Sequence, residues 1–261
     1  MVDRLFTRRL SAGFLVVTLL SVGGCVASYA APGRGANMQL LTAAARDQQT
    51  DSPVQEALSR QPLAKLPTAI AVVRIQAPGY QSQTAQCWGR GAYSVITTRD
   101  IENSDELMAR LGKLPMVSGL APINRMLLPA EFHSDLELRQ AAAALHADMV
   151  LIYTLDTTFN VQDVALPLSV VTLGLSPNEV AHVICTASAV LLDTRNGYVY
   201  GVAEATADQK QLASAWTNAA AVDQARRRVE AKAFEKLVGQ TEKTWQGVVT
   251  NLTAASSASA P

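Results

Sequence analysis

The sequence has few of the side chains from which active sites are usually built. Its only histidines are His133, His146 and His182, and no two of them have the spacing of a zinc-protease helix. It also has no Gly-x-Ser-x-Gly elbow, no phosphate-binding P-loop and no Gly-x-Gly-x-x-Gly dinucleotide motif. These absences predict a protein that is not an enzyme and that has no cofactor and no metal site.

An excess of charge of either sign is also missing. The chain has 22 basic and 22 acidic residues. A balanced charge gives no positive surface for DNA or RNA, so nucleic acid is excluded as a partner. The one basic run, residues 226–228, is predicted to be a solvated helix face, with an anionic partner as the alternative. Of the three tryptophans, Trp245 lies on an apolar helical stripe, whereas Trp88 lies in a loop and could contact a partner.

No long hydrophobic run is present at the N-terminus. The apolar residues 12–22 form a segment shorter than the roughly 20 residues that a membrane-spanning helix needs. Arg4, Arg8 and Arg9 precede this segment, and two glycines and Cys25 follow it. This order is typical of a bacterial lipoprotein signal peptide over residues 1–24, with Cys25 as the lipidation site. The alternative is an ordinary signal peptide with a chance cysteine.

Lipidation at Cys25 predicts where the protein is located. The following residue is Val26, where an aspartate would favour the inner membrane. We therefore expect an outer-membrane lipoprotein on the periplasmic face, which contacts the membrane through its N-terminal lipid.

Two further cysteines, Cys87 and Cys185, follow the predicted lipidation site. In an oxidising periplasm they could form a disulfide. The alternative is a loop thiol at Cys87 and a buried thiol at Cys185, which lies within an apolar strand pattern.

The order of predicted elements indicates one α/β domain. Residues 25–66 are expected to be a lipid anchor and flexible tether, residues 67–250 the globular domain, and residues 251–261 a disordered tail. A β-branched run at residues 68–76 and an apolar run at residues 149–155 predict buried strands.

Helices and a hairpin complete the predicted domain. Asn103 is expected to cap a helix that ends near residue 112, and Ser134 with Glu137 forms a capping box before a second helix. Residues 183–192 and 198–206 form a hairpin around an Asn-Gly turn. A long amphipathic helix over residues 217–249, which Gly239 could end, closes the domain. These elements predict an α+β mixed sheet of about five or more strands with helices packed on it.

Residues 138–155 (LRQAAAALHADMVLIYTL) form a capped, alanine-rich helix that leads into an apolar strand. This stretch resembles the domain shared by the curli-secretion lipoprotein CsgG, the penicillin-binding-protein activator LpoB and the TolB amino-terminal region. Residues 187–201 (ASAVLLDTRNGYVYG) are similar to the closing hairpin of rhombotarget-type lipoproteins. The resemblance covers roughly residues 66–240. The curli channel carries insertions whose alternating, lipid-facing strands build a barrel. The candidate insertion in this chain, residues 159–183, lacks that clean alternation.

The absence of catalytic motifs and the resemblance together imply a non-enzymatic envelope protein. We expect its periplasmic domain to bind an unknown envelope protein or to serve envelope assembly. One alternative is an oligomeric secretion or structural component of CsgG type, which would make the chain a homo-oligomer. The second alternative is a hydrolase that acts on cell-envelope material, which requires a pocket that joins acidic residues with His133 or His182.

Overall fold

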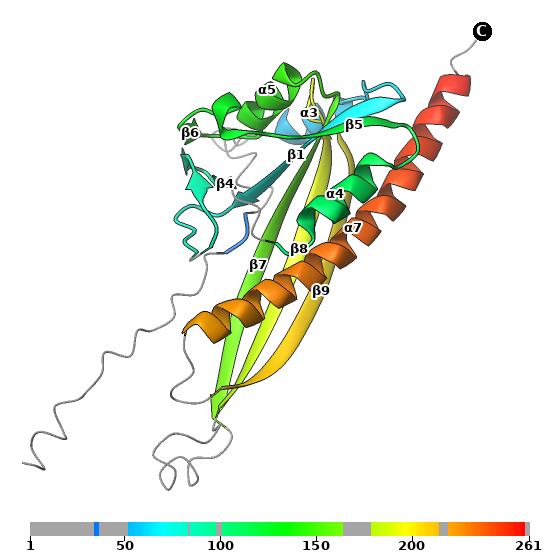
Figure 1. The fold of residues 1–261 in the computed structure, drawn as a ribbon. Helices are drawn as coiled ribbons and strands as arrows, with labels where there is room; N and C mark the ends of the chain where they lie inside the picture. Colours follow the sequence, from blue (N-terminus) through cyan, green and yellow to red (C-terminus); the bar gives the residue numbers. More distant parts are fainter. Residues whose placement is uncertain are drawn as a thin grey trace, which may run out of the picture.

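The computed structural model describes residues 34–36, 52–82, 84–97, 101–163, 179–213 and 219–258. It shows the predicted mixed sheet, which has seven strands, together with helices and a long C-terminal helix (Figure 1). The elements in chain order are α3 (Ser52–Ser59), β1 (Thr68–Gln76), β2 (Cys87–Trp88), β3 (Arg90–Gly91), β4 (Ser94–Ile96), α4 (Ser104–Gly112), β5 (Val117–Pro122), η2 (Arg125–Leu127), β6 (Glu131–Phe132), α5 (Leu136–Ala144), β7 (Met149–Asp163), β8 (Glu179–Asp193), β9 (Val199–Ala213) and α7 (Ala219–Ala258). The strand order in the main sheet is β2-β4-β1-β7-β8-β9, and β5 also pairs with β1.

Strand β1 covers residues 68–76, as its run of β-branched residues predicted. Almost every residue of β1 is buried, because the strand has neighbours on both edges and packed layers on both faces. One edge pairs in parallel with β7. The other edge is shared: β5 pairs in parallel with the first half of β1, and β4 pairs antiparallel with residues 74–76. The sheet therefore forks at the middle of β1.

Alternate residues of the central strands face two separate cores. Val72 and Leu151 belong to a core that α4 and α7 cover, whereas Val73 and Ile152 belong to a core that α5 covers. This alternation follows from the two-residue period of a strand. The upper part of the sheet therefore lies between two helical layers.

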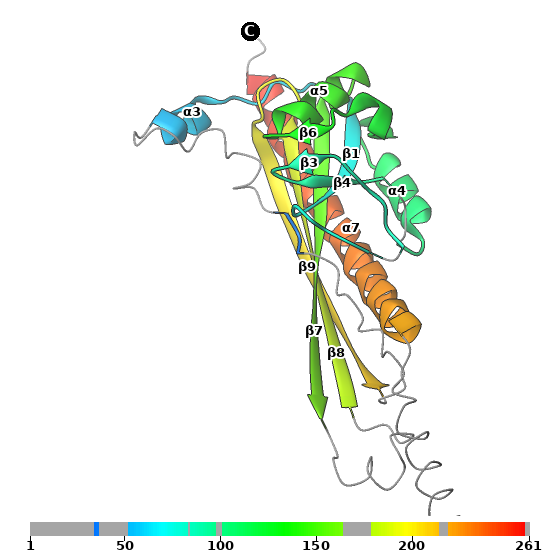
Figure 2. The same cartoon turned by 90° about the vertical axis from the view of Figure 1, so that its left-hand side faces the viewer.

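The strands β7, β8 and β9 are longer than the sequence predicted. Each has 15 residues, and the three form an arm that extends beyond the body of the domain (Figures 1 and 2). The apolar run at residues 149–155 predicts only the first half of β7. The apolar signal ends there, but Thr157 and Thr158 are β-branched and continue the strand. The middle of the candidate insertion, residues 164–178, lies outside the described residues.

Helix α7 runs along one face of this arm and buries the predicted stripe. Ala225, Val229, Leu237 and Trp245 are each at most 3% exposed. Gly239 does not end the helix, which continues to Ala258, beyond the predicted start of a disordered tail at residue 251. A mid-helix glycine costs about 1 kcal/mol relative to alanine, and burial of Trp245 offsets that cost.

One predicted helix cap is formed in part, since the N-cap residue of α5 is Asp135 rather than Ser134, and one is wrong. The Glu137 carboxylate accepts hydrogen bonds from the backbone N–H groups of His133 and Ser134, and Ser134 Oγ accepts one from Leu136 N–H, at the start of α5. Asn103, by contrast, makes no side-chain cap at α4 and has a left-handed backbone with φ of 60°. Asparagine tolerates that conformation, so its local role is in the turn.

Candidate functional site

Part of the predicted tether lies against the sheet. The Arg34 carbonyl accepts a hydrogen bond from Ala77 N–H at 3.1 Å, and Ala36 N–H donates to Thr154 Oγ1 at 3.0 Å. A Cβ at Gly35 would lie 3.0 Å from Thr154 Oγ1, so only glycine allows this close approach without a shift. Cys25 itself lies outside the described residues. Residues 25–66 are therefore not a free tether over their whole length.

A second contact fastens the segment just before β1, the end of the linker formed by residues 25–66. The carboxylate of Asp193, at the end of β8, accepts hydrogen bonds from Leu63 N–H at 2.9 Å and Ala64 N–H at 3.0 Å. Tyr200 donates its hydroxyl proton to the same oxygen at 2.6 Å. Burial and this bond to Asp193 raise the pKa of Tyr200 well above its usual value, so Tyr200 stays a donor.

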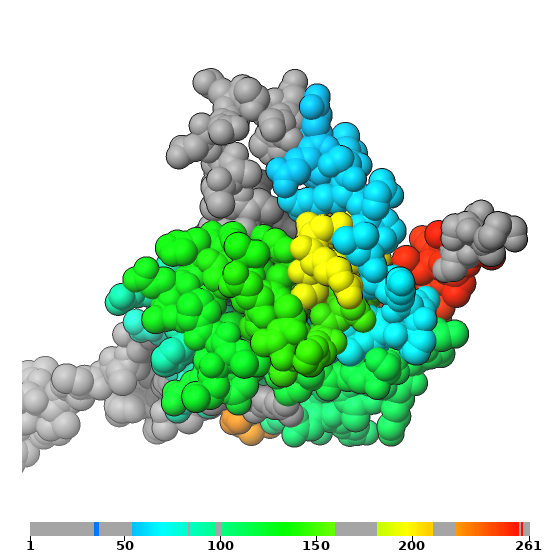
Figure 3. Space-filling model, turned by 90° about the horizontal axis from the view of Figure 1, so that it is seen from above, coloured from blue at the N-terminus to red at the C-terminus, as the bar shows by residue number. Residues whose placement is uncertain are grey.

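The same linker crosses the turn of the hairpin. Asn196 Nδ2 donates to the Gln61 carbonyl at 2.7 Å, and Arg60 donates to the Gly197 carbonyl at 3.5 Å. Figure 3 shows residues 52–66, in cyan, beside the β8–β9 turn, in yellow. The Asn-Gly turn therefore both closes the hairpin and holds the segment that enters the domain.

The basic run on α7 is only partly solvated, contrary to the prediction for residues 226–228. Arg226 is fully buried, and its guanidinium donates to Asp223 at 3.0 Å, to Glu230 at 2.7 Å and to Thr84 Oγ1 at 2.8 Å. Burial opposes the charge of Arg226, but the two carboxylates outweigh it and raise its pKa further. Arg228 is exposed, as predicted.

This buried ion cluster reaches the sheet through Thr157 on β7, which donates to Glu230 at 3.0 Å. Cys185 on β8 lies beside Thr157 and is fully buried. The pKa of the Cys185 thiol is raised to about 12, mainly because the thiol is buried. Cys185 is therefore a neutral core thiol.

The two candidate disulfide cysteines are not brought together. Neither forms a disulfide with the other, and Cys87 is exposed on β2. Four strand-to-strand steps separate β2 from β8, which is about 19 Å at the usual strand spacing. A disulfide needs Cα atoms within about 7 Å, so this arrangement allows none.

Thiol labelling checks this arrangement. In a Cys25→Ser chain at pH 8, we expect a maleimide to label Cys87 quickly and to leave Cys185 unlabelled, because a thiol with a pKa of about 12 is almost entirely protonated there. Denaturation in urea should raise labelling from one equivalent to two, as read by intact mass. Two equivalents in the native protein, or none without a reductant, would contradict the structure.

The three histidines lie apart. His133 and His146 are exposed near opposite ends of α5, and His182 Nε2 on β8 lies 3.1 Å from Asp208 Oδ2. His146 has a left-handed backbone with φ of 55° just after α5 ends, so it serves in the helix terminus. Among the residues that the structure describes, no group of three metal-ligating side chains could hold an ion.

A wide opening lies where the sheet forks. This fork cleft has a volume of about 820 Å³ and lies between α4 and the edge of β1 that β4 and β5 share. Among the described residues, the charged side chains that line it are Arg74, Lys113, Arg125 and Asp105. Arg74 is only 4% exposed, whereas the other three are exposed. No motif in the sequence marks this site.

Trp88, which was predicted to lie in a loop, lies instead on the short strand β2, close to the fork cleft. The Arg125 guanidinium carbon is 5.3 Å from the centre of the Trp88 ring, a cation–π distance, and Trp88 Nε1 donates to the Pro129 carbonyl at 3.0 Å. Trp245 is buried as predicted and donates to the Pro115 carbonyl at 2.8 Å. Trp216 lies outside the described part of the chain.

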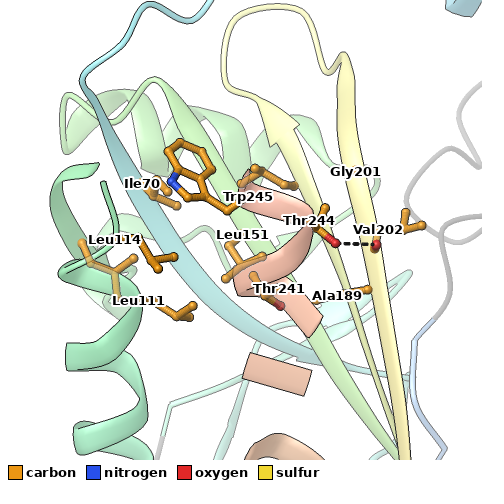
Figure 4. A pocket seen from close by; sticks show the side chains of 13 residues that line it. Ile70, Leu111, Leu114, Leu151, Ala189, Gly201, Val202, Thr241, Thr244 and Trp245 are labelled. Carbon is orange, nitrogen blue, oxygen red and sulfur yellow. Dashed lines mark hydrogen bonds between the residues drawn. The ribbon is translucent and has the colours of Figure 1, made fainter. Parts of the chain in front are cut away.

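A smaller gap lies beneath α7, beside Trp245 and Leu111 (Figure 4). Its volume is about 30 Å³, which is comparable to the space of one water molecule. The side chains around it are almost all apolar, apart from Thr241 and Thr244. It is a packing gap and has no room for a ligand.

No helix in the described ranges is both long enough and apolar enough to cross a membrane. Attachment to a membrane through Cys25 remains a prediction, because that residue is outside those ranges.

Comparisons with known proteins found no matching family model and no matching curated protein. Among solved structures, the chain is similar to protein XCC0632 from Xanthomonas campestris (family model DUF330), with 13% identity and a TM-score of 0.33 over 73% of this chain and 94% of that one. It is also similar to a neuraminyllactose-binding hemagglutinin homolog from Helicobacter pylori, with 11% identity and a TM-score of 0.30 over 70% and 91% of the two chains. Lipoprotein GNA1162 from Neisseria meningitidis has 13% identity and a TM-score of 0.26 over 60% and 91%.

None of these three is named as an enzyme, and one is named a lipoprotein. Identities and TM-scores this low carry no argument about what the chain binds or does. The resemblance to CsgG, LpoB and TolB remains a prediction.

Proposed function

We propose that this chain is a non-enzymatic lipoprotein of the cell envelope. Acyl chains on Cys25 hold it at the periplasmic face of the outer membrane, where its α/β domain binds another envelope protein. The observation that supports this role best is the way the linker is fastened to the domain. Residues 34–36 contact β7 and the end of β1, and Asp193 holds residues 63 and 64.

The contact of residues 34–36 with the sheet limits how far the domain can lie from a membrane that holds Cys25. An extended chain from Cys25 to Arg34 reaches about 30 Å at most. That length is about the diameter of a small domain, so a lipid at Cys25 would keep the sheet near the membrane surface. It would also limit which face of the domain a partner in the periplasm can reach. A freely mobile linker over residues 25–66 would impose no such limit.

Site-specific photocrosslinking in intact cells tests this function. A photoreactive amino acid at Met126, which is 83% exposed next to the residues that line the fork cleft, should give a discrete adduct with an envelope protein. The matched position is Leu58 on α3, which is 78% exposed on a different element. The adduct should disappear when Cys25→Ser is added, because the domain is then no longer held near its partner. The absence of any adduct at both positions, or an adduct that persists in the Cys25→Ser chain, would contradict the proposal.

Self-association is the alternative, and one observation favours it. Val202 on β9 is 66% exposed, and β9 is the last strand of the sheet. Exposed edge strands pair readily with other chains. Helix α7 covers part of this edge, however: Lys236 donates to the Thr206 carbonyl at 2.9 Å and Thr244 to the Val202 carbonyl at 3.3 Å. These bonds occupy backbone groups that a second strand would need.

The hydrolase alternative required a pocket that joins acidic residues with His133 or His182. Neither histidine is among the residues that line the fork cleft. His182 instead faces Asp208 on the neighbouring strand, with the ring nitrogen 3.1 Å from the carboxylate.

A further inference from the structure

The fork cleft has the dimensions and the mixed chemistry of a ligand site. Its volume of about 820 Å³ falls within the range of about 300–1,000 Å³ that small-molecule pockets occupy. We propose that it binds a small amphiphilic anion, a molecule with a carboxylate or phosphate head on an apolar body. This site is separate from the linker contacts and does not depend on the lipid anchor.

The charge of the lining selects an anion. Among the described residues that line the cleft, Arg74, Lys113 and Arg125 are cationic and Asp105 is anionic. Arg74 lies on β1 and is 4% exposed, and Ile96 of β4 and Tyr153 of β7 are its direct neighbours across the sheet. Its guanidinium already donates to the Tyr80 hydroxyl at 3.4 Å and lies 5.9 Å from the centre of the Tyr80 ring. A guanidinium held in a wall of low dielectric interacts more strongly with an anion than one in water. Its planar donors also match the two oxygens of a carboxylate or phosphate.

The apolar residues that line the cleft favour a ligand with an apolar body. Ile96 from β4, Ile101 and Met108 on the α4 side, and Leu120 and Ile123 from β5 and beyond all line the same cleft. Methionine is unbranched and adapts to irregular apolar ligands. A simple inorganic anion would leave these side chains without a partner, so the ligand carries hydrocarbon as well as charge.

Contacts of Trp88 and Asn124 beside the cleft hold its opening in shape. Trp88 donates to the Pro129 carbonyl and carries Arg125 on its ring at 5.3 Å. Asn124 Oδ1 accepts from Met126 N–H at 3.0 Å and fixes the start of the short helix η2, which carries Arg125. A site formed before the ligand arrives loses less conformational entropy on binding.

Calorimetric titration of the full Cys25→Ser chain, purified without detergent, tests the site. The probes are decanoate, decyl phosphate and decyltrimethylammonium, which share one chain length and differ in the charged head. We expect saturable binding of at least one anion and none of the cation, and the better anion identifies the head group. Equal binding of the cation, or no binding of either anion up to about 1 mM, the weak limit of ordinary ligand affinity, would overturn the proposal.

Variants connect binding to these residues. Arg74→Gln should weaken the anion at least tenfold. Because Arg74 is buried and its replacement could impair folding, the double variant Lys113→Gln/Arg125→Gln changes only exposed side chains, and it should weaken binding at least threefold. Lys232→Gln is the matched control, since Lys232 is exposed on α7 and is not among the residues that line the cleft. A loss in the control equal to that in the double variant would also overturn the proposal.

Discussion

Replacing Arg226 with alanine should unfold the domain at markedly lower urea concentration than the wild type. The side chain is fully buried and carries the only positive charge shown bonded to both Asp223 and Glu230 in the described part of the chain. Without it, Glu230, which is 2% exposed, loses this ion pair, and Asp223, which is 5% exposed, is left with its longer pair to Arg227 Nε at 3.5 Å. Removal of one partner from a buried ion pair costs about 3–5 kcal/mol, which is a large share of the 5–15 kcal/mol by which ordinary domains are stable.

The matched control is Arg228→Ala, which removes the same side chain from an exposed position two residues away. Exposed ion pairs contribute about 0–1 kcal/mol, so this variant should unfold close to the wild-type midpoint. Circular dichroism during urea titration gives both midpoints. Equal midpoints for the two variants would show that the Arg226 cluster contributes no stability. Replacement of Arg226, Asp223 and Glu230 together by apolar residues should recover part of the loss, because no buried charge is then left unpaired.

Cys25→Ser should move the protein from the membrane fraction to the soluble periplasmic fraction. The reason is that the acyl chains, which supply the proposed attachment, form on the thiol of Cys25, and serine cannot carry them in the same linkage. The domain itself should stay folded, since the first described contact with the sheet begins nine residues later, at Arg34. Fractionation followed by immunoblotting measures the distribution, and unfolding in urea measures the stability. A Cys25→Ser chain that stayed in the membrane fraction would contradict lipid anchoring.

Local patterns in the sequence predicted most of the central fold. The β-branched run at residues 68–76 became β1 with the same bounds, and Glu137 bonds the Ser134 N–H before α5 as expected. The apolar stripe of α7 is buried as expected. These features depend on neighbours within a few residues, so a short window of sequence contains the information.

The features that were missed depend on contacts between distant segments. The pairing of β4 and β5 with the same edge of β1 creates the fork cleft, and no local pattern specifies it. A signal for Arg74 was present, since it is the one charged residue within an otherwise buried strand. The ion pairs of Arg226 could also have been predicted. Asp223 lies three residues before it and Glu230 four residues after it, on one helical face beside the apolar stripe.

The contacts of the linker with the sheet also could not be predicted from local sequence patterns. Residues 34–36 read as flexible because Gly35 and its neighbours have no periodicity, yet Thr154 and Ala77 hold them against the sheet. Those partners lie on β7 and after β1, far away in the sequence. Composition describes how a segment behaves alone and does not include a surface that it meets after folding.

The mass of the mature N-terminal peptide tests the central claim most directly. Protein extracted from membranes is digested, and the peptide that begins at residue 25 is measured. We predict cleavage after Gly24 and a Cys25 that carries acyl chains. A peptide that begins elsewhere, or one that contains an unmodified Cys25, would contradict the account.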